Sequence, residues 1–224
     1  MAAIATGPVR VLLRGLSVLE GAAPEWDLTS APADPVELFD EWLRHAADND
    51  VPEPHAMTLS TVDDSGDPDA RILILKDVDA AGWHFAASAA SPKGRELATR
   101  PAAALTFYWP KLVRQVRVRG PVVLDPPTVR IADFRARSIG SRKMASTLRQ
   151  SQTLRHPDEI DDALHAAAQR LTDDPDYVPD AWTSYAVQPR TVEFWQGDPH
   201  RRHLRLRYER IDVDQTWGTS ALWP

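Results

Sequence analysis

The feature that most constrains the fold is a series of short strand-like runs joined by turns of only a few residues. AMTLSTV (56–62), ARILILK (70–76) and WHFAAS (83–88) are separated by the turn sequences DDSGDP and DVDAAG. AALTFYW, VRQVRVRG and VVL follow between residues 103 and 124, and further strands are expected at 182–187, 191–195, 203–211 and 217–222. Short turns join antiparallel neighbours, whereas parallel strands need long crossovers, so the sequence predicts an antiparallel barrel of about eight strands.

Prolines mark where the helices around this barrel begin. Asp34-Pro35 supplies an N-cap and a first-turn proline, and apolar residues at helical spacing follow to about Asn49. Similar starts predict helices from residue 91, from 125 to about 137, and from 156 to about 171, whereas residues 138–153 are polar and expected to be irregular. The fold class is therefore α+β, mainly β. Residues 1–33 are expected to form a loosely structured N-terminal arm, and residues 34–224 one domain.

Composition excludes several classes of function. The net charge of -6 argues against general nucleic-acid binding, which needs a basic face. There is no cysteine, which excludes disulfides, thiolate metal sites and a cysteine nucleophile. No apolar run approaches the ~20 residues of a membrane helix, no convincing signal-peptide cleavage site follows the N-terminus, and the histidines show no metal-ligand spacing. The sequence predicts a cytoplasmic protein without a metal site and without membrane or nucleic-acid partners.

Positive charge is nevertheless concentrated in residues 201–208. Arg201, His203, Arg205 and Arg207 occupy every second position, and most of the residues between them are apolar. In a strand these four side chains would share one face. A surface strand rarely needs so many like charges, so the pattern predicts a pocket for an anionic ligand.

Other cationic, amide and aromatic side chains fall at strand ends and in loops. They are Arg71, Lys76, Lys93, Gln115, Gln150, Ser151, Trp195 and Gln196. Each alone is more often solvated or structural, but together they fit a phosphorylated aromatic ligand, with Arg and Lys for the phosphate, Gln and Ser for ring heteroatoms, and Trp for a flat ring. Motifs of nucleophilic or metal catalysis such as GxSxG and HExxH are missing, so a bound cofactor is expected to supply the difficult step.

The order of these motifs resembles the pyridoxamine 5′-phosphate oxidase family, FMN-dependent enzymes with a split-barrel fold. The resemblance runs from about residue 33 to the C-terminus and includes ADPVELFDEWL, EPHAMTLSTVD, ARILILK, SPKGREL, RQVRV, RQS, VEFWQG and RRHLRLRY. It implies an antiparallel split β-barrel with peripheral helices and a homodimer with FMN at the subunit interface. It also implies a small-molecule substrate, dioxygen as the electron acceptor, and hydrogen peroxide as a product.

The resemblance also implies which residues form the site. The cofactor-binding residues are Arg71, Ile72, Leu73, Ile74, Leu75, Lys76, Ala86, Ala87, Lys93, Gln115, Gln150, Ser151, Trp195 and Arg205. The substrate-binding residues are Lys76, Arg137, Ser141, Arg201 and His203. Arg201 and His203 are the catalytic candidates, with Arg201 holding an anionic substrate group and His203 orienting the substrate or relaying a proton.

Several positions depart from the members that oxidise pyridoxamine phosphate. Pro92 replaces an arginine, and Asp133 replaces a tyrosine, which places a carboxylate where a substrate phosphate would be held. These changes and the N-terminal arm resemble the flavin oxidases of phenazine biosynthesis, although Lys76 and Ser141 are retained. The leading hypothesis is a dihydrophenazine-carboxylate-type substrate. The alternatives are the vitamin B6 reaction, which makes pyridoxal 5′-phosphate, and a flavin-binding split barrel without catalysis.

Overall fold

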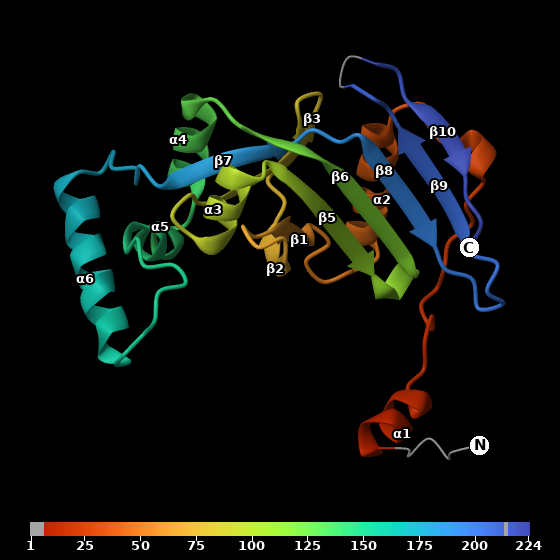
Figure 1. Cartoon of the computed structure of the whole chain (residues 1–224), viewed down its shortest axis with the longest axis horizontal. Coiled ribbons are helices and arrows are strands. Elements are labelled where there is room, and N and C mark those ends of the chain that lie inside the picture. Colours follow the sequence, from red (N-terminus) through yellow and green to blue (C-terminus); the bar gives the residue numbers. More distant parts are fainter. Residues whose placement is uncertain (1–6, 213–214) are drawn as a thin grey trace.

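The computed structural model describes residues 7–212 and 215–224, and a curled antiparallel sheet forms its centre (Figure 1). The strands are β1 (Ala56–Val62), β2 (Pro68–Ile74), β3 (Asp77–Asp79), β4 (Gly82–Ser88), β5 (Ala102–Trp109), β6 (Arg114–Leu124), β7 (Trp182–Val187), β8 (Thr191–Gln196), β9 (Leu204–Glu209) and β10 (Gly218–Ala221). The α-helices are α1 (Pro8–Gly15), α2 (Pro35–Asp48), α3 (Pro92–Thr99), α4 (Pro127–Ala136), α5 (Ile139–Ser146) and α6 (Asp158–Asp173). Two short 3-10 helices are η1 (Leu28–Ser30) and η2 (Pro110–Leu112).

The sheet is organised around β6. Strands follow one another in the order β10-β9-β8-β6-β5-β1-β2. Residues 114–119 of β6 pair with β8, whereas residues 122–124 pair with β7, which pairs in turn with β4. Gly120 lies where β6 changes partner, and a Cβ there would come within 2.0 Å of the Gln188 carbonyl oxygen. Only glycine allows this close approach of two backbones.

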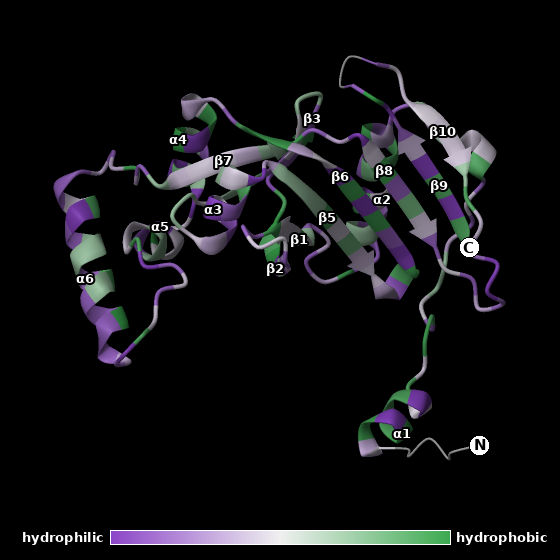
Figure 2. Cartoon of the chain, viewed as in Figure 1, coloured by the Kyte–Doolittle hydropathy of each residue, from purple (hydrophilic) through white to green (hydrophobic). Residues whose placement is uncertain are grey.

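The core lies between helix α2 and the sheet. Phe39 and Trp42 of α2 are buried, and their ring centroids lie 5.0 Å from Phe107 of β5 and 5.1 Å from Phe194 of β8. Figure 2 shows hydrophilic and hydrophobic residues alternating along β6, β8 and β9, which is the pattern of strands with one buried and one polar face. No helix in the described ranges is long and apolar enough to cross a membrane.

The expected split antiparallel barrel with peripheral helices is confirmed, with differences in detail. The described ranges contain ten strands instead of about eight, and the two runs expected at 113–120 and 122–124 are one strand, β6. Residues 138–153, expected to be irregular, contain α5. The arm carries helix α1, all of whose residues are exposed, while its residues 1–6 lie outside the described part of the chain. The division into arm and domain stays a prediction.

Candidate functional site

Nine of the expected site residues line one cavity of about 750 Å³, here called the first cavity, between β2, β4 and helices α5 and α6. They are Ile72, Leu73, Ile74, Lys76, Ala86, Ala87, Arg137, Ser141 and Gln150. β2 is the last strand of the sheet, so its outer edge has no strand partner among the described residues, and Ile72 on this strand is 64% exposed. An unpaired edge with an exposed apolar side chain is a surface suited to a ligand or a second protein chain.

Lys76, Trp182 and Arg137 line the polar end of the first cavity, and Asp133 of α4, which is not a wall residue, contacts Lys76 and Trp182. Lys76 Nζ lies 3.3 Å from Asp133 Oδ1, and Trp182 Nε1 donates a hydrogen bond to Asp133 Oδ2 at 3.0 Å. The Arg137 guanidinium stacks on the Trp182 ring, 4.3 Å from its centroid, and its buried Nε has no hydrogen-bond partner in the described chain. Burial lowers the pKa of Arg137, and the nearby Asp133 opposes that shift. Asp133 therefore offsets the charge of Lys76, and Arg137 keeps an unused donor.

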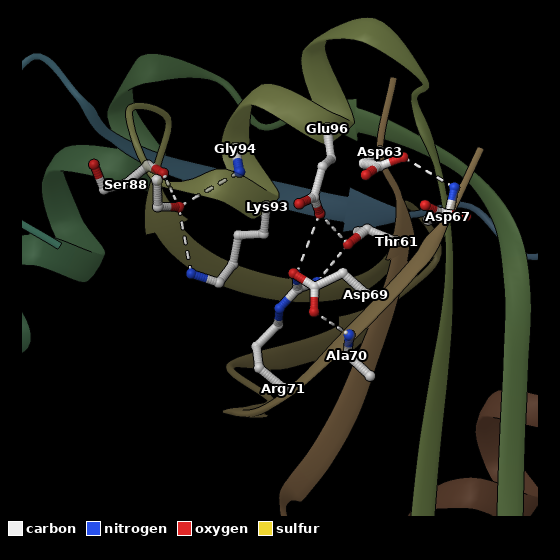
Figure 3. Close-up of polar contacts among 11 residues, drawn as sticks. Thr61, Asp63, Asp67, Asp69, Ala70, Arg71, Ser88, Lys93, Gly94 and Glu96 are labelled. Carbon is white, nitrogen blue, oxygen red and sulfur yellow. Dashed lines mark hydrogen bonds and ion pairs between the residues drawn. The ribbon is translucent and has the colours of Figure 1, made fainter. Parts of the chain in front are cut away.

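Arg71 and Lys93 place two positive charges beside the first turn of α3 (Figure 3). Lys93 is only 5% exposed, and its Nζ donates to Ser91 Oγ at 3.3 Å. Burial and the charge of Arg71 lower the pKa of Lys93, against the opposing effect of Glu96. The Arg71 guanidinium contacts the carboxylates of Asp69 and Glu96. A buried ammonium whose charged form is disfavoured would gain from an anionic ligand, so this pair fits a phosphate group.

Arg201, His203 and Trp195 line a second cavity of about 500 Å³. Because β9 begins only at Leu204, Arg201 and His203 lie in the loop before it, and the strand expected over 203–211 was too long. Arg201 has a φ of 66°, which interrupts any extended alternation at this point. The backbone N–H of Asp198 donates to His203 Nδ1 at 2.9 Å, so the neutral imidazole carries its proton on Nε2.

Gln115, Trp195 and Arg205 form one row across β6, β8 and β9. Gln115 lies opposite Trp195, and Trp195 lies opposite Arg205. Arg205 and Arg117 both bind the buried Glu193, with N–O distances of 2.8 and 2.7 Å. Burial alone would raise the pKa of Glu193, but the hydrogen bonds from these two arginines hold it below its usual value. Glu193 thereby fixes Arg205 beside Trp195 and the second cavity.

The two groups of residues lie on different parts of the same sheet. β2 is separated from β9 by β1, β5, β6 and β8. At ~4.8 Å per strand, the two are about 24 Å apart along the sheet. Figure 1 shows α4, α5 and α6 at one end of the molecule and β8, β9 and β10 at the other. Of the remaining expected residues, Leu75 is buried in the core and Ser151 belongs to neither cavity wall. One chain therefore keeps these expected site residues in two separate groups, here called half-sites.

Several wall residues were missed by reasoning from the sequence. They are Ser88, Trp182, Met144, Leu148, Leu154 and Ile160 at the first cavity, and Tyr108 and residues 17–21 at the second. Met144 and Leu148 are four positions apart, a helical spacing that the polar composition of residues 138–153 obscured. The sequence of residues 17–21 carries no local signal that they lie beside Tyr108 of β5 and Trp195 of β8, because this contact joins segments far apart in the sequence.

The chain is similar to known proteins over most of its length. Residues 43–171 match the family model described as pyridoxamine 5′-phosphate oxidase, and residues 182–224 match the pyridoxine 5′-phosphate oxidase C-terminal dimerisation region. A pyridoxine/pyridoxamine 5′-phosphate oxidase of Pseudomonas fluorescens (strain SBW25) is 43% identical over 196 residues, covering 87% of this chain and 90% of that protein. One from Paraburkholderia phytofirmans is 40% identical over 198 residues, covering 88% and 92%.

Two solved structures are also similar. PhzG from Burkholderia lata 383, crystallised in complex with tetrahydrophenazine-1-carboxylic acid, has a TM-score of 0.80 at 29% identity, covering 91% of this chain and all of that chain. A pyridoxamine 5′-phosphate oxidase-related, FMN binding protein from Nostoc punctiforme has a TM-score of 0.68 at 20% identity, covering 85% and 98%. The second likeness supports the fold alone.

Proposed function

Because this chain belongs to the pyridoxamine 5′-phosphate oxidase family, we propose that it is an FMN-dependent oxidase that acts as a homodimer on a small reduced nitrogen heterocycle. The observation that carries the proposal is the division of the expected site into two half-sites on one chain. Two copies related by a two-fold axis would join these half-sites twice, giving two complete sites. The match of residues 182–224 to a dimerisation region supports the same arrangement.

The residues present fit FMN. Lys93 and Arg71 would hold its phosphate, because the buried ammonium gains most from an anionic partner. Residues 72–74 of the unpaired β2 edge offer apolar side chains and free backbone groups for a flat ring system. Gln115 and Trp195, from the second copy, would add an amide and an aromatic face. When bound, FMN would supply the redox step, accepting two electrons from the substrate and passing them to dioxygen to give hydrogen peroxide.

Arg201 and His203 would bind and orient the substrate. His203 accepts the Asp198 N–H at Nδ1, so its Nε2–H remains to donate to a substrate heteroatom. The ring of Trp195 lies 5.0 Å from that of His203 and limits how the imidazole can turn. The Arg201 guanidinium would bind a substrate carboxylate, which fixes the orientation of the ring that is oxidised.

Asp133 makes the polar end of the first cavity less favourable to a phosphate than Lys76 and Arg137 alone would be. Asp133 lies 3.3 Å from Lys76 and already offsets that charge. A phosphate with a charge near -2 would be repelled by Asp133 about twice as strongly as a carboxylate in the same place. We therefore infer a dihydrophenazine-carboxylate-type substrate. The likeness to PhzG, crystallised with tetrahydrophenazine-1-carboxylic acid, supports this inference.

Pyridoxine or pyridoxamine 5′-phosphate is the second candidate substrate. The relatives at 40 and 43% identity are named for that reaction. Lys76, Arg137 and Ser141, the residues expected to hold substrate oxygens, also line one cavity together. The two candidates differ in the charge and geometry of their anionic group, so a direct comparison separates them.

The test is anaerobic reduction of the flavin in protein reconstituted with FMN. We expect tetrahydrophenazine-1-carboxylic acid to bleach the flavin absorbance, and pyridoxine 5′-phosphate to do so much more slowly. Bleaching by the phosphate alone would assign the second candidate. If FMN binds but neither compound bleaches it, the protein is a flavin-binding barrel without this activity, and a protein that does not bind FMN refutes the proposal. The double variant Arg201→Ala/His203→Ala should keep FMN and lose the bleaching.

A further inference from the structure

The loop between β8 and β9 carries both candidate catalytic residues, and Asp198 makes three of its hydrogen bonds. The backbone N–H of Asp198 donates to His203 Nδ1 at 2.9 Å, and its carbonyl oxygen accepts the Arg201 N–H at 2.9 Å. Its side-chain Oδ1 accepts the His200 N–H at 2.6 Å. A carboxylate that binds the N–H two residues further on forms an Asx turn, and an aspartate followed by proline favours such a turn. Residues 198–203, here called the Asp198 loop, are therefore closed on one residue.

Arg201 has a strained backbone that this loop must hold. Its φ of 66° lies in the left-handed region, which costs free energy for any residue other than glycine. Such a conformation persists only where surrounding contacts fix it. The Arg201 N–H is bound by the Asp198 carbonyl, and after Arg201 the chain returns so that His203 meets the Asp198 N–H. The hydrogen bonds of Asp198 thus hold the strained residue from both sides.

A second turn of the same kind begins at Asp174, which is also followed by proline. Asp174 Oδ1 accepts the Asp176 N–H and the Asp174 carbonyl accepts the Tyr177 N–H, both at 3.1 Å. Tyr177 holds the place that Arg201 has in the Asp198 loop, but it has no positive φ. Figure 1 shows this second turn, between α6 and β7, at the opposite end of the molecule from the loop between β8 and β9. An Asx turn alone therefore does not require a left-handed residue, and that conformation belongs to the loop that also returns to the Asp198 N–H.

Asp198 also distinguishes two neighbouring arginines. It is the only acidic residue among residues 194–208. Its Oδ2 lies 3.9 Å from Arg202 Nε, whereas Arg201 has no carboxylate within 4.0 Å in the part of the chain that the structure describes. The Arg202 side chain is 82% exposed, and Arg201 lines the second cavity. The turn thus leaves Arg201 available to an anionic ligand.

We propose that Asp198 is a positioning residue for the substrate, and that its carboxylate closes the turn that presents Arg201 and His203 together in the wall of the second cavity. The inference rests on the proposed function, which assigns these two residues to the substrate. A loop that is ordered before the ligand arrives loses less conformational freedom on binding, so the ligand binds more tightly. If the loop is ordered in only a fraction of the molecules, the apparent dissociation constant rises by the inverse of that fraction.

The test compares single variants of the full-length, FMN-loaded protein by titration with phenazine-1-carboxylate, followed by flavin absorbance. Asp198→Ala removes the acceptor of the His200 N–H, and we expect the dissociation constant to rise at least about tenfold. Asp198→Asn keeps an acceptor oxygen and loses only the exposed ion pair with Arg202, so its constant should stay within about threefold of wild type. Asp174→Ala removes the matched turn, far from the second cavity, and should change the constant less than about twofold.

The affinity for FMN separates positioning from a general loss of structure. It should change less than about threefold in all three variants, because the residues expected to hold the FMN phosphate lie beside α3. An unchanged phenazine-1-carboxylate constant in Asp198→Ala overturns the proposal. An equal loss in Asp198→Asn, or an equal loss of FMN affinity in Asp198→Ala, overturns it as well.

A second measurement needs no substrate-like ligand. Hydrogen exchange of the backbone N–H groups of residues 198 and 201, followed by NMR, should be at least about tenfold faster in Asp198→Ala than in wild type or Asp198→Asn. Equal exchange rates contradict the role of the carboxylate in closing the loop. If wild type binds neither phenazine-1-carboxylate nor pyridoxal 5′-phosphate, the proposed function fails and this inference fails with it. If wild type binds and Asp198→Ala binds equally well, only this inference fails.

Discussion

Asp133→Asn should convert the polar end of the first cavity into a better phosphate site. Asp133 Oδ1 lies 3.3 Å from Lys76 Nζ, and Asp133 Oδ2 accepts the Trp182 indole N–H at 3.0 Å. Asparagine has nearly the same shape and keeps an oxygen that can accept the indole N–H. The substitution therefore removes the negative charge while preserving the local hydrogen bond.

The magnitude follows from the geometry. A ligand oxygen bound to Lys76 on the side away from Asp133 would lie on the order of 6 Å from the carboxylate. Lys76 is 33% exposed, so the effective dielectric constant lies between those of a protein surface and water. At ~40, the repulsion is about 1.4 kcal/mol per unit of ligand charge, or about tenfold in affinity. The variant should gain about tenfold for a carboxylate and up to about 100-fold for a phosphate.

The assay is titration of FMN-loaded wild type and variant with phenazine-1-carboxylate and pyridoxal 5′-phosphate, followed by the change in flavin absorbance. The ratio of the two dissociation constants should shift about tenfold toward the phosphate ligand. Asp176→Asn is the control, because Asp176 pairs with Arg135, is 83% exposed and lies outside the cavity wall. It should leave both constants within about twofold. Equal gains for both ligands would refute the inference that the charge of Asp133 sets the preference.

Three further outcomes are expected. Arg205→Ala should weaken FMN binding at least about tenfold, measured by flavin fluorescence. The control is Arg117→Ala, which removes the other guanidinium on the same buried glutamate and should change FMN binding less than about threefold. Burial would lower the pKa of His84, but hydrogen bonds to two aspartates raise it above 6.5. The ion pairs of protonated His84 therefore stabilise the folded protein fully below that pH, and this stabilisation is lost as pH rises through the raised pKa. Melting temperatures of wild type and His84→Gln should differ more at about pH 6 than at about pH 9. Gly21→Ala should release the arm from η2, which faster trypsin cleavage after Arg14 would report with little change in melting temperature.

The fold could be predicted because its signals are local. Turn length and alternation identify β1, β2 and β4, and the Asp34-Pro35 start of α2 is visible in two residues. The joining of two runs into β6 could not be seen in this way. Gly120 and Pro121 resemble a turn, but both pair with β5, and residues 122–124 pair with β7, so the strand continues. Tertiary pairing decided the outcome against the local signal.

The candidate site was predicted as a set of residues, but not as an arrangement. The resemblance implies FMN at a subunit interface without assigning each residue to one side of it, whereas strand order determines which residues one chain can bring together. Lys76, which follows β2, and Asp133 of α4 meet although they lie 57 positions apart in the sequence. Nothing in the spacing of these two residues indicates that a carboxylate offsets the cation. Which residues fall in which half-site likewise follows from the strand order.

The cations at residues 201–207 show how contacts in the folded chain pair most of the charges of a sequence pattern with carboxylates. Arg205 binds Glu193 at 2.8 Å, and Arg207 lies 3.3 Å from Glu209. Arg201 alone among these arginines has no carboxylate within 4.0 Å in the described ranges, and it lines the second cavity. Of the anion-binding face expected of the whole strand, one guanidinium at a cavity wall is therefore left for a ligand. A single guanidinium matches a planar carboxylate with two hydrogen bonds and balances its one charge, whereas a phosphate would remain partly uncompensated.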